Sequence, residues 1–245
     1  MIKALSILLL LMLAGAAFGA TTDPGVPVFG PNGKAGVTIS TPMQIIILLT
    51  LMTLLPAAVM SVSPFLRIVI VLHFLRQALG TQTVPSNQVT VGLALFLAFL
   101  IMQPVIVDIY HHGWEPVENG QMSWQQGFDE GSKPLKAFLL RFAREKDIKT
   151  CLEIAKASPP RTPQDLDLKV LVPAYILSEM KAGFQIGAVL FLPFLIIDLV
   201  VASVTLSIGM IQLPPVMISA PFKILLFVLV DGWNLVIGSL MKSFY

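Results

Sequence analysis

Residues 184–241, which read FQIGAVLFLPFLIIDLVVASVTLSIGMIQLPPVMISAPFKILLFVLVDGWNLVIGSLM, decide the fold of this chain. They contain two long apolar blocks, Phe184–Met210 and Val216–Met241, which are joined only by Ile211–Pro215. A connection this short between two long helices makes them run antiparallel. The sequence therefore predicts a helical hairpin in residues 184–245.

Three further apolar blocks precede this hairpin. They are Met43–Met60, Pro64–Leu79 and Val89–Tyr110, and the short turn between the last two predicts a second hairpin. The chain is 56% hydrophobic and 12% charged, with a mean hydropathy of +0.83. Soluble domains have about 25% charged residues, so too little polar surface is available here to cover a soluble monomer. We therefore predict an all-α membrane protein, in which long helical hairpins flank a charged, mostly helical insert.

The charged residues gather in that insert, which we place at residues 111–183. Of the 30 acidic and basic residues, 20 lie between His111 and Ala182, ten of each sign. This neutral window leaves no basic stripe for nucleic acid, so we expect no nucleic-acid partner. Apolar residues at helical spacing predict an amphipathic helix with Ser132 as its N-cap and Pro159–Pro160 as its end.

The first 20 residues have the form of a secretory signal peptide. Lys3 is followed by a short apolar run and then by small residues. An uncleaved membrane helix is the alternative, although the run is shorter than the ~20 residues needed to span a bilayer. Residues 21–42 are rich in glycine and proline and predict a flexible tether, and residues 43–110 form the first apolar helical region.

The side of the membrane on which the insert lies depends on how many early blocks cross. If the first two blocks both cross, the insert is cytoplasmic. If only the first crosses, the insert lies outside, and Arg67 and Arg76 face the cytoplasm. The positive-inside rule favours the second arrangement, so we expect a periplasmic insert.

Several charged residues lie within the apolar blocks or at their ends, where an unpaired charge costs at least ~2.5–3.5 kcal/mol at mid-bilayer. These residues are Arg67, Arg76, Asp108, Asp198, Lys223 and Asp231. If the last hairpin folds about Gln212, Asp198 comes close to Lys223 and Asp231. We expect Arg67, Arg76, Asp198, Lys223 and Asp231 to form an ion-pair network between helices or subunits, with Glu179 as a further partner for Lys223. A proton or ion relay is the alternative.

Residue patterns typical of enzymes are missing from the sequence. Cys151 is the only cysteine, so neither an intrachain disulfide nor a cysteine-based zinc site can form. No phosphate-binding glycine loop and no nucleophile elbow occurs. We predict no enzymatic activity, no metal and no cofactor.

Two stretches are specific enough to point to a family. Residues 63–97 read SPFLRIVIVLHFLRQALGTQTVPSNQVTVGLALFL, and residues 178–240 contain SEMKAGFQIGAVLFLPFLIIDLVVASVTLSIGM followed by LPPVMISAPFKILLFVLVDGWNLVIGSL. In this order they resemble the FliP family of type III secretion export-gate proteins. The signal peptide and the length resemble the flagellar branch of that family, and an injectisome-type homologue is the alternative.

The resemblance implies a subunit of the flagellar type III protein export gate in the bacterial inner membrane, within the flagellar basal body. It implies a pentamer that assembles with FliQ-like and FliR-like subunits, beside an FlhB-like switch protein. The assembly would form the central channel for unfolded flagellar export substrates. A stand-alone secondary transporter or channel is the alternative function.

The resemblance also implies a gate in the turn of the last hairpin. In the family, a methionine-rich loop between the last two helices rings the pore. The corresponding segment here is residues 209–215, and its candidate gate residues are Met210, Ile211, Gln212 and Leu213. Because only Met210 remains of the methionine run and Ile211 is stiffer, we expect a less deformable gate. An ordinary turn closed by two prolines is the alternative.

Overall fold

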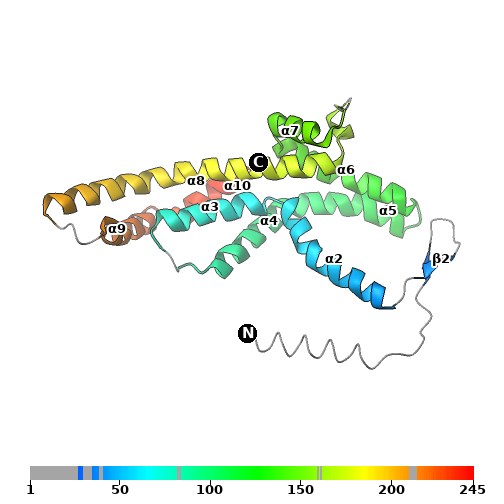
Figure 1. Cartoon of the computed structure of the whole chain (residues 1–245), viewed down its shortest axis with the longest axis horizontal. Coiled ribbons are helices and arrows are strands. Elements are labelled where there is room, and N and C mark those ends of the chain that lie inside the picture. The colour runs from blue at the N-terminus through cyan, green and yellow to red at the C-terminus, as the bar shows by residue number, and fades with distance from the viewer. Residues whose placement is uncertain are drawn as a thin grey trace, which may run out of the picture. The chain divides into compact units, whose positions relative to one another are not determined.

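The structure is a computed structural model, and it describes residues 27–29, 35–38, 41–81, 84–158, 160, 162–209 and 214–245 (Figure 1). The chain divides into two compact units, residues 1–57 and 58–245. In the first unit, strands β1 (Pro27–Phe29) and β2 (Ala35–Thr38) pair antiparallel within the segment expected to be a tether. The predicted signal peptide, residues 1–20, lies outside the described residues.

The remaining described chain is almost entirely helical, which confirms the predicted all-α membrane fold. Its elements are α2 (Thr41–Ser61), α3 (Phe65–Ala78), α4 (Asn87–Ile109), the π-helical turn η1 (Tyr110–Trp114), α5 (Glu115–Glu118), α6 (Trp124–Phe142), α7 (Glu145–Ala155), the 3-10 turn η2 (Pro163–Asp165), α8 (Leu168–Ser207), α9 (Pro215–Leu229) and α10 (Gly232–Lys242).

Three described helical stretches are long and apolar enough to cross a membrane, namely Pro42–Ser61, Asn87–Glu118 and Leu168–Ser207. A fourth is added if α9 and α10 count as one bent span. The 14 residues of α3 rise only about 21 Å along the helix axis. Because the hydrocarbon core is ~30 Å thick, α3 is too short to cross alone.

The main core forms where α3 lies along α8 (Figure 1). One face of α3, including Ile68, Val71 and Leu75, is completely or almost completely buried. On α8, Gly183 faces Ile70 and Gly187 faces Phe74, and a methyl group added at Gly187 would lie 2.6 Å from the Phe74 ring. The GxxxG pair therefore lets these two helices approach closely, as small residues do in membrane helix pairs.

Helix α8 is much longer than the apolar block that predicted it. It runs for 40 residues from Leu168, with the Asp167 side chain accepting a hydrogen bond from Lys169 N at its start. The helix therefore starts inside the charged window and reaches the last hairpin without interruption. Pro173 and Pro193 lie within it.

The start and the length predicted for the amphipathic helix of the insert were wrong. Helix α6 begins nine residues earlier than expected, after a capping box in which Ser123 Oγ accepts from Gln126 N and Gln126 Oε1 accepts from Ser123 N. This box satisfies two free N–H groups and therefore outweighs the weaker signal at Ser132, which lies inside the helix. Helix α6 ends at Phe142 and α7 starts at Glu145, so the predicted single helix is two.

The last apolar block is also two helices, since α9 and α10 meet at an angle of 67°. Asp231 adopts a left-handed conformation with φ of 51° at this break. Gly232 follows, and a methyl group there would lie 2.2 Å from the Phe227 ring. Asp-Gly is a common turn dipeptide, so the signal for a break was present in the sequence.

We expect Gly187→Ala to lower the free energy of unfolding by about 1–3 kcal/mol, because the added methyl displaces Phe74 from its contact with α8. The matched control is Gly92→Ala in α4, where no described heavy atom outside the local backbone lies within 4 Å of the added methyl. That change should be neutral or slightly stabilising, because alanine is the better helix former. Thermal unfolding in detergent, followed by circular dichroism, measures both. Equal effects of the two substitutions would contradict the close packing.

Candidate functional site

Arg67 on α3 and Glu179 on α8 form a buried, bidentate ion pair. Arg67 Nε donates to Glu179 Oε2 at 2.9 Å, and Arg67 Nη2 donates to the other carboxylate oxygen. The two side chains expose 7% and 0% of their surfaces. Because either charge alone would be strongly disfavoured in this setting, the pair fixes the register of α3 against α8.

Two other parts of the chain close over the same guanidinium group. Arg67 Nη1 donates to Ser243 Oγ at 3.1 Å, just after α10 ends. The Phe244 ring centroid lies 4.0 Å from Arg67 Cζ, and that of Phe142, the last residue of α6, lies 5.5 Å away. Aromatic faces attract cations, so Arg67 also holds the ends of α6 and α10 against α3.

A second ion pair joins the two arms of the last hairpin. Lys223 Nζ on α9 donates to Asp198 Oδ2 on α8 at 2.6 Å. Ser219, one turn earlier on α9, donates from Oγ to the other oxygen, Asp198 Oδ1. The Lys223 side chain is only 2% exposed and that of Asp198 26%. The pair therefore aligns α8 and α9 in one register.

The other predicted members do not complete a single network. Glu179 binds Arg67 rather than Lys223. Within the described ranges, Arg76 and Asp231 make no ion pair: Arg76 Nη1 donates to Pro85 O at 3.4 Å, and Asp231 Oδ2 accepts from Asn234 Nδ2 at 3.2 Å. The break between α9 and α10 explains why Asp231 does not join Asp198 and Lys223. The break ends the straight helix on which the expected alignment rested.

The candidate gate residues Met210, Ile211, Gln212 and Leu213 lie outside the described residues. The structure does define both ends of the segment. Helix α8 ends at Ser207 and is followed by Gly209 with φ of +81°, a conformation that glycine adopts readily. Helix α9 starts at Pro215 with Pro214 as its N-cap, and proline is well suited to a first helical turn.

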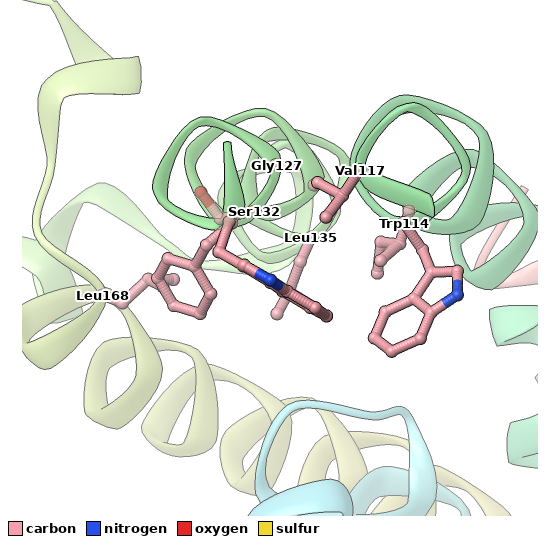
Figure 2. Close-up of a pocket in the computed structure, with 11 residues that line it drawn as sticks. Trp114, Val117, Gly127, Ser132, Leu135 and Leu168 are labelled. Atoms are coloured by element: carbon pink, nitrogen blue, oxygen red, sulfur yellow. The ribbon is translucent and has the colours of Figure 1, made fainter. Parts of the chain in front are cut away.

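The insert carries an apolar cavity of about 340 Å³. Figure 2 shows Trp114 of η1, Val117 of α5, Leu135 of α6 and Leu168 of α8 around it. The Trp114 and Trp124 rings meet edge to face at 5.6 Å, and Trp124 is 70% exposed. Large exposed aromatic surface of this kind is typical of sites that contact other proteins or lipid.

A polar cluster joins the start of α7 to α8 beside the first ion pair. Asp147 Oδ2 accepts from Ser178 Oγ at 2.5 Å and from Arg144 Nε at 2.8 Å, and Arg144 N donates to Ser178 Oγ at 2.9 Å. Burial by itself would raise the pKa of Asp147. The hydrogen bonds from Ser178 and Arg144, with the charge of Arg144, outweigh burial and hold the pKa of Asp147 below its ordinary value.

A family model matches most of the chain's sequence. The model described as the FliP family matches residues 48–240 and so covers both buried ion pairs. The chain belongs to the FliP family.

Curated relatives agree with this assignment and are named flagellar biosynthetic protein FliP. The protein of Pectobacterium carotovorum subsp. carotovorum is 47% identical over 215 residues, which cover 88% of this chain and 83% of the relative. That of Cereibacter sphaeroides is 44% identical over 244 residues, covering 96% and 81%. That of Bacillus subtilis (strain 168) is 46% identical over 206 residues, covering 84% and 93%. The predicted FliP resemblance is confirmed.

Four residues around these two ion pairs, Phe142 among them, were missed from the sequence. Ser219 had a detectable signal, because it lies four residues before Lys223 and so shares its helix face. Ser243 and Phe244 had no such signal in the sequence, because they reach Arg67 only after α10 turns back at the break. Polar and aromatic partners brought together by tertiary folding leave no spacing pattern in the sequence.

Glu179→Gln should lower the free energy of unfolding by about 3–5 kcal/mol, because it leaves the Arg67 guanidinium buried without its counter-charge. The double variant Arg67→Met with Glu179→Leu should lose much less, since no unpaired charge remains. As a control, Glu130→Gln breaks the exposed pair with Lys133 and should change stability by less than about 1 kcal/mol. Denaturant unfolding in detergent measures all three. A double variant as unstable as the single one would contradict a role in charge pairing.

The lowered pKa of Asp147 predicts that the free energy of unfolding depends on pH. Because its pKa is lower in the folded chain than in the unfolded chain, its contribution is fully present above the ordinary pKa of ~3.9. The contribution is lost as the pH falls through the lowered folded-state pKa. We expect the wild type to exceed Asp147→Asn in free energy of unfolding by roughly 1 kcal/mol near neutral pH, with a smaller difference below about pH 4. Unfolding curves over this pH range measure the difference, and a constant difference would count against the prediction.

Proposed function

We propose that this FliP-family chain is a subunit of the flagellar type III protein export gate. In this proposal it forms part of the central channel through which unfolded flagellar proteins are exported. The observation that carries the proposal is the family match over residues 48–240, supported by flagellar biosynthetic relatives that align with most of the chain.

The last hairpin supplies the channel gate in this proposal. The segment 209–215 closes the hairpin of α8 and α9, and the Lys223–Asp198 pair holds the two helices in register below it. Met210, Ile211, Gln212 and Leu213 would then ring the pore. A single methionine makes this ring less deformable than a run of thioether side chains.

Exposed apolar surface supports assembly with other subunits. Along α8 and α9, large side chains such as Leu199, Leu206, Met217 and Leu229 are at least 60% exposed. Surface of this kind packs against lipid or against neighbouring protein. We assign it to contacts within a pentamer of this chain and with FliQ-like and FliR-like subunits, beside an FlhB-like switch protein.

We place the assembly in the bacterial inner membrane at the flagellar basal body, with the insert on the periplasmic side. Residues 1–20 act as a signal peptide and residues 21–42 as a tether in this arrangement. The shortness of α3 supports it, because α2 can cross the membrane and α3 cannot cross alone. The segment 111–183 then follows one early crossing rather than two.

The two buried ion pairs act as structural pins in this proposal, not as a proton relay. A relay usually needs a carboxylate that is free of a fixed partner. Glu179 is held by Arg67 through two hydrogen bonds, and Asp198 is held by Lys223 and Ser219. No catalytic step is assigned to the chain.

Deletion of the gene tests the export function, and loop variants test the gate. The deletion strain should lack filaments and should not secrete hook subunits, and the wild-type chain should restore both.

Replacing Met210, Ile211 and Gln212 by glycine should raise ion conductance across the membrane, because the pore then lacks side chains that seal it.

The matched control replaces Asn119, Gln121 and Met122, in the exposed turn before α6, by glycine. This control should leave the conductance at the wild-type level. Normal secretion in the deletion strain would overturn the export role. Unchanged conductance in the loop variant would overturn the gate, and a stable homo-oligomer that transports a solute alone would favour a stand-alone transporter.

A further inference from the structure

A second cavity, of about 270 Å³, lies beside the turn between α3 and α4. Its lining is mostly apolar and comes from α3, α4 and α10, with Leu72, Leu75, Leu93 and Ile237 among its residues. Unlike the cavity of the insert, this cavity is lined by a cation. The cation is Arg76, in the last turn of α3.

Arg76 has no counter-charge in its part of the chain. The sequence contains no acidic residue between Asp23 and Asp108. Within the described ranges Arg76 forms no ion pair, and its hydrogen bond to Pro85 O is long, at 3.4 Å. A guanidinium group carries five N–H donors and stays charged. The C-terminal dipole of α3 offsets only part of this charge, equivalent to roughly half an elementary charge.

The start of α4 adds to the positive potential at this place. Pro85 and Val89, on either side of the N-cap Ser86, line the same cavity as Arg76. The first turn of α4 contains no acidic residue. Free N–H groups at a helix start favour an anion, so they reinforce the preference set by Arg76.

We propose that this cavity binds a phospholipid with an anionic headgroup. The phosphate lies against Arg76, and an acyl chain lies against the apolar lining formed by Leu72, Leu75 and Ile237. Trp233, which is 39% exposed, lines the cavity from α10, and tryptophan is the residue that membrane proteins enrich at the headgroup level. Charge complementarity selects the anionic headgroup, and the apolar lining selects an amphiphile over a small soluble anion. The proposal does not depend on the export function.

Lipid binding in this cavity can be tested by native mass spectrometry of the full chain in detergent. Phosphatidylglycerol and phosphatidylcholine with matched acyl chains are the two probes. The wild type should retain one phosphatidylglycerol with about tenfold preference over phosphatidylcholine, as expected for one charge-assisted contact. Arg76→Gln should abolish that preference. Glycerol phosphate, which lacks acyl chains, should not compete.

The control Lys242→Gln removes an exposed positive charge from the last turn of α10 and should leave the preference intact. A second variant, Val89→Trp, leaves Arg76 in place but fills the cavity, so it should reduce retention of both lipids. Circular dichroism and elution as a single species establish that each variant is folded. The proposal would be overturned if wild type and Arg76→Gln retained phosphatidylglycerol equally, or if glycerol phosphate competed with it. It would also be overturned if the wild type showed no headgroup preference. The last result would point instead to an acidic side chain of a neighbouring subunit.

Discussion

A charge that cannot remain unpaired away from water is the constraint on which this structure depends. Arg67 lies on the otherwise apolar buried face of α3, and among the described residues only Glu179 of α8 pairs with its charge, through two hydrogen bonds. Since the cost of separating the two charges is several kcal/mol, α3 has essentially one position along α8. The ends of α6 and α10 then close over the same group through Phe142, Ser243 and Phe244.

Helix α8 is the common partner in both ion pairs, because it contributes both acids. Glu179 binds a base on α3, and Asp198 binds a base on α9. The two acids are separated by about 28 Å along the helix axis, close to the ~30 Å thickness of a hydrocarbon core. The pins therefore set the register of α8 at two points, one just before its apolar block and one in the middle of that block, while Gly183 and Gly187 allow close contact between them.

The apolar blocks predicted the helices well, because burial in lipid or protein requires long uninterrupted apolar runs. The hairpin closed by Pro214–Pro215 also placed Lys223 near Asp198. Three features were predicted wrongly or not at all, and each has a physical cause. A capping box at Ser123 outweighed the signal at Ser132, charged residues hid the first turns of α8, and an Asp-Gly break redirected α10. The partners of Arg67 could not be predicted, because they meet only through tertiary folding.

The two prolines inside α8 bear on how this chain can move. A helix of 40 residues is about 60 Å long, and here it connects the charged insert to the hairpin turn. Each proline removes one backbone hydrogen bond, so bending costs least next to Pro173 and Pro193. Pro173 precedes Glu179, and Pro193 lies between the two acids. The stretch between the prolines can therefore tilt as one short segment relative to both ends of α8.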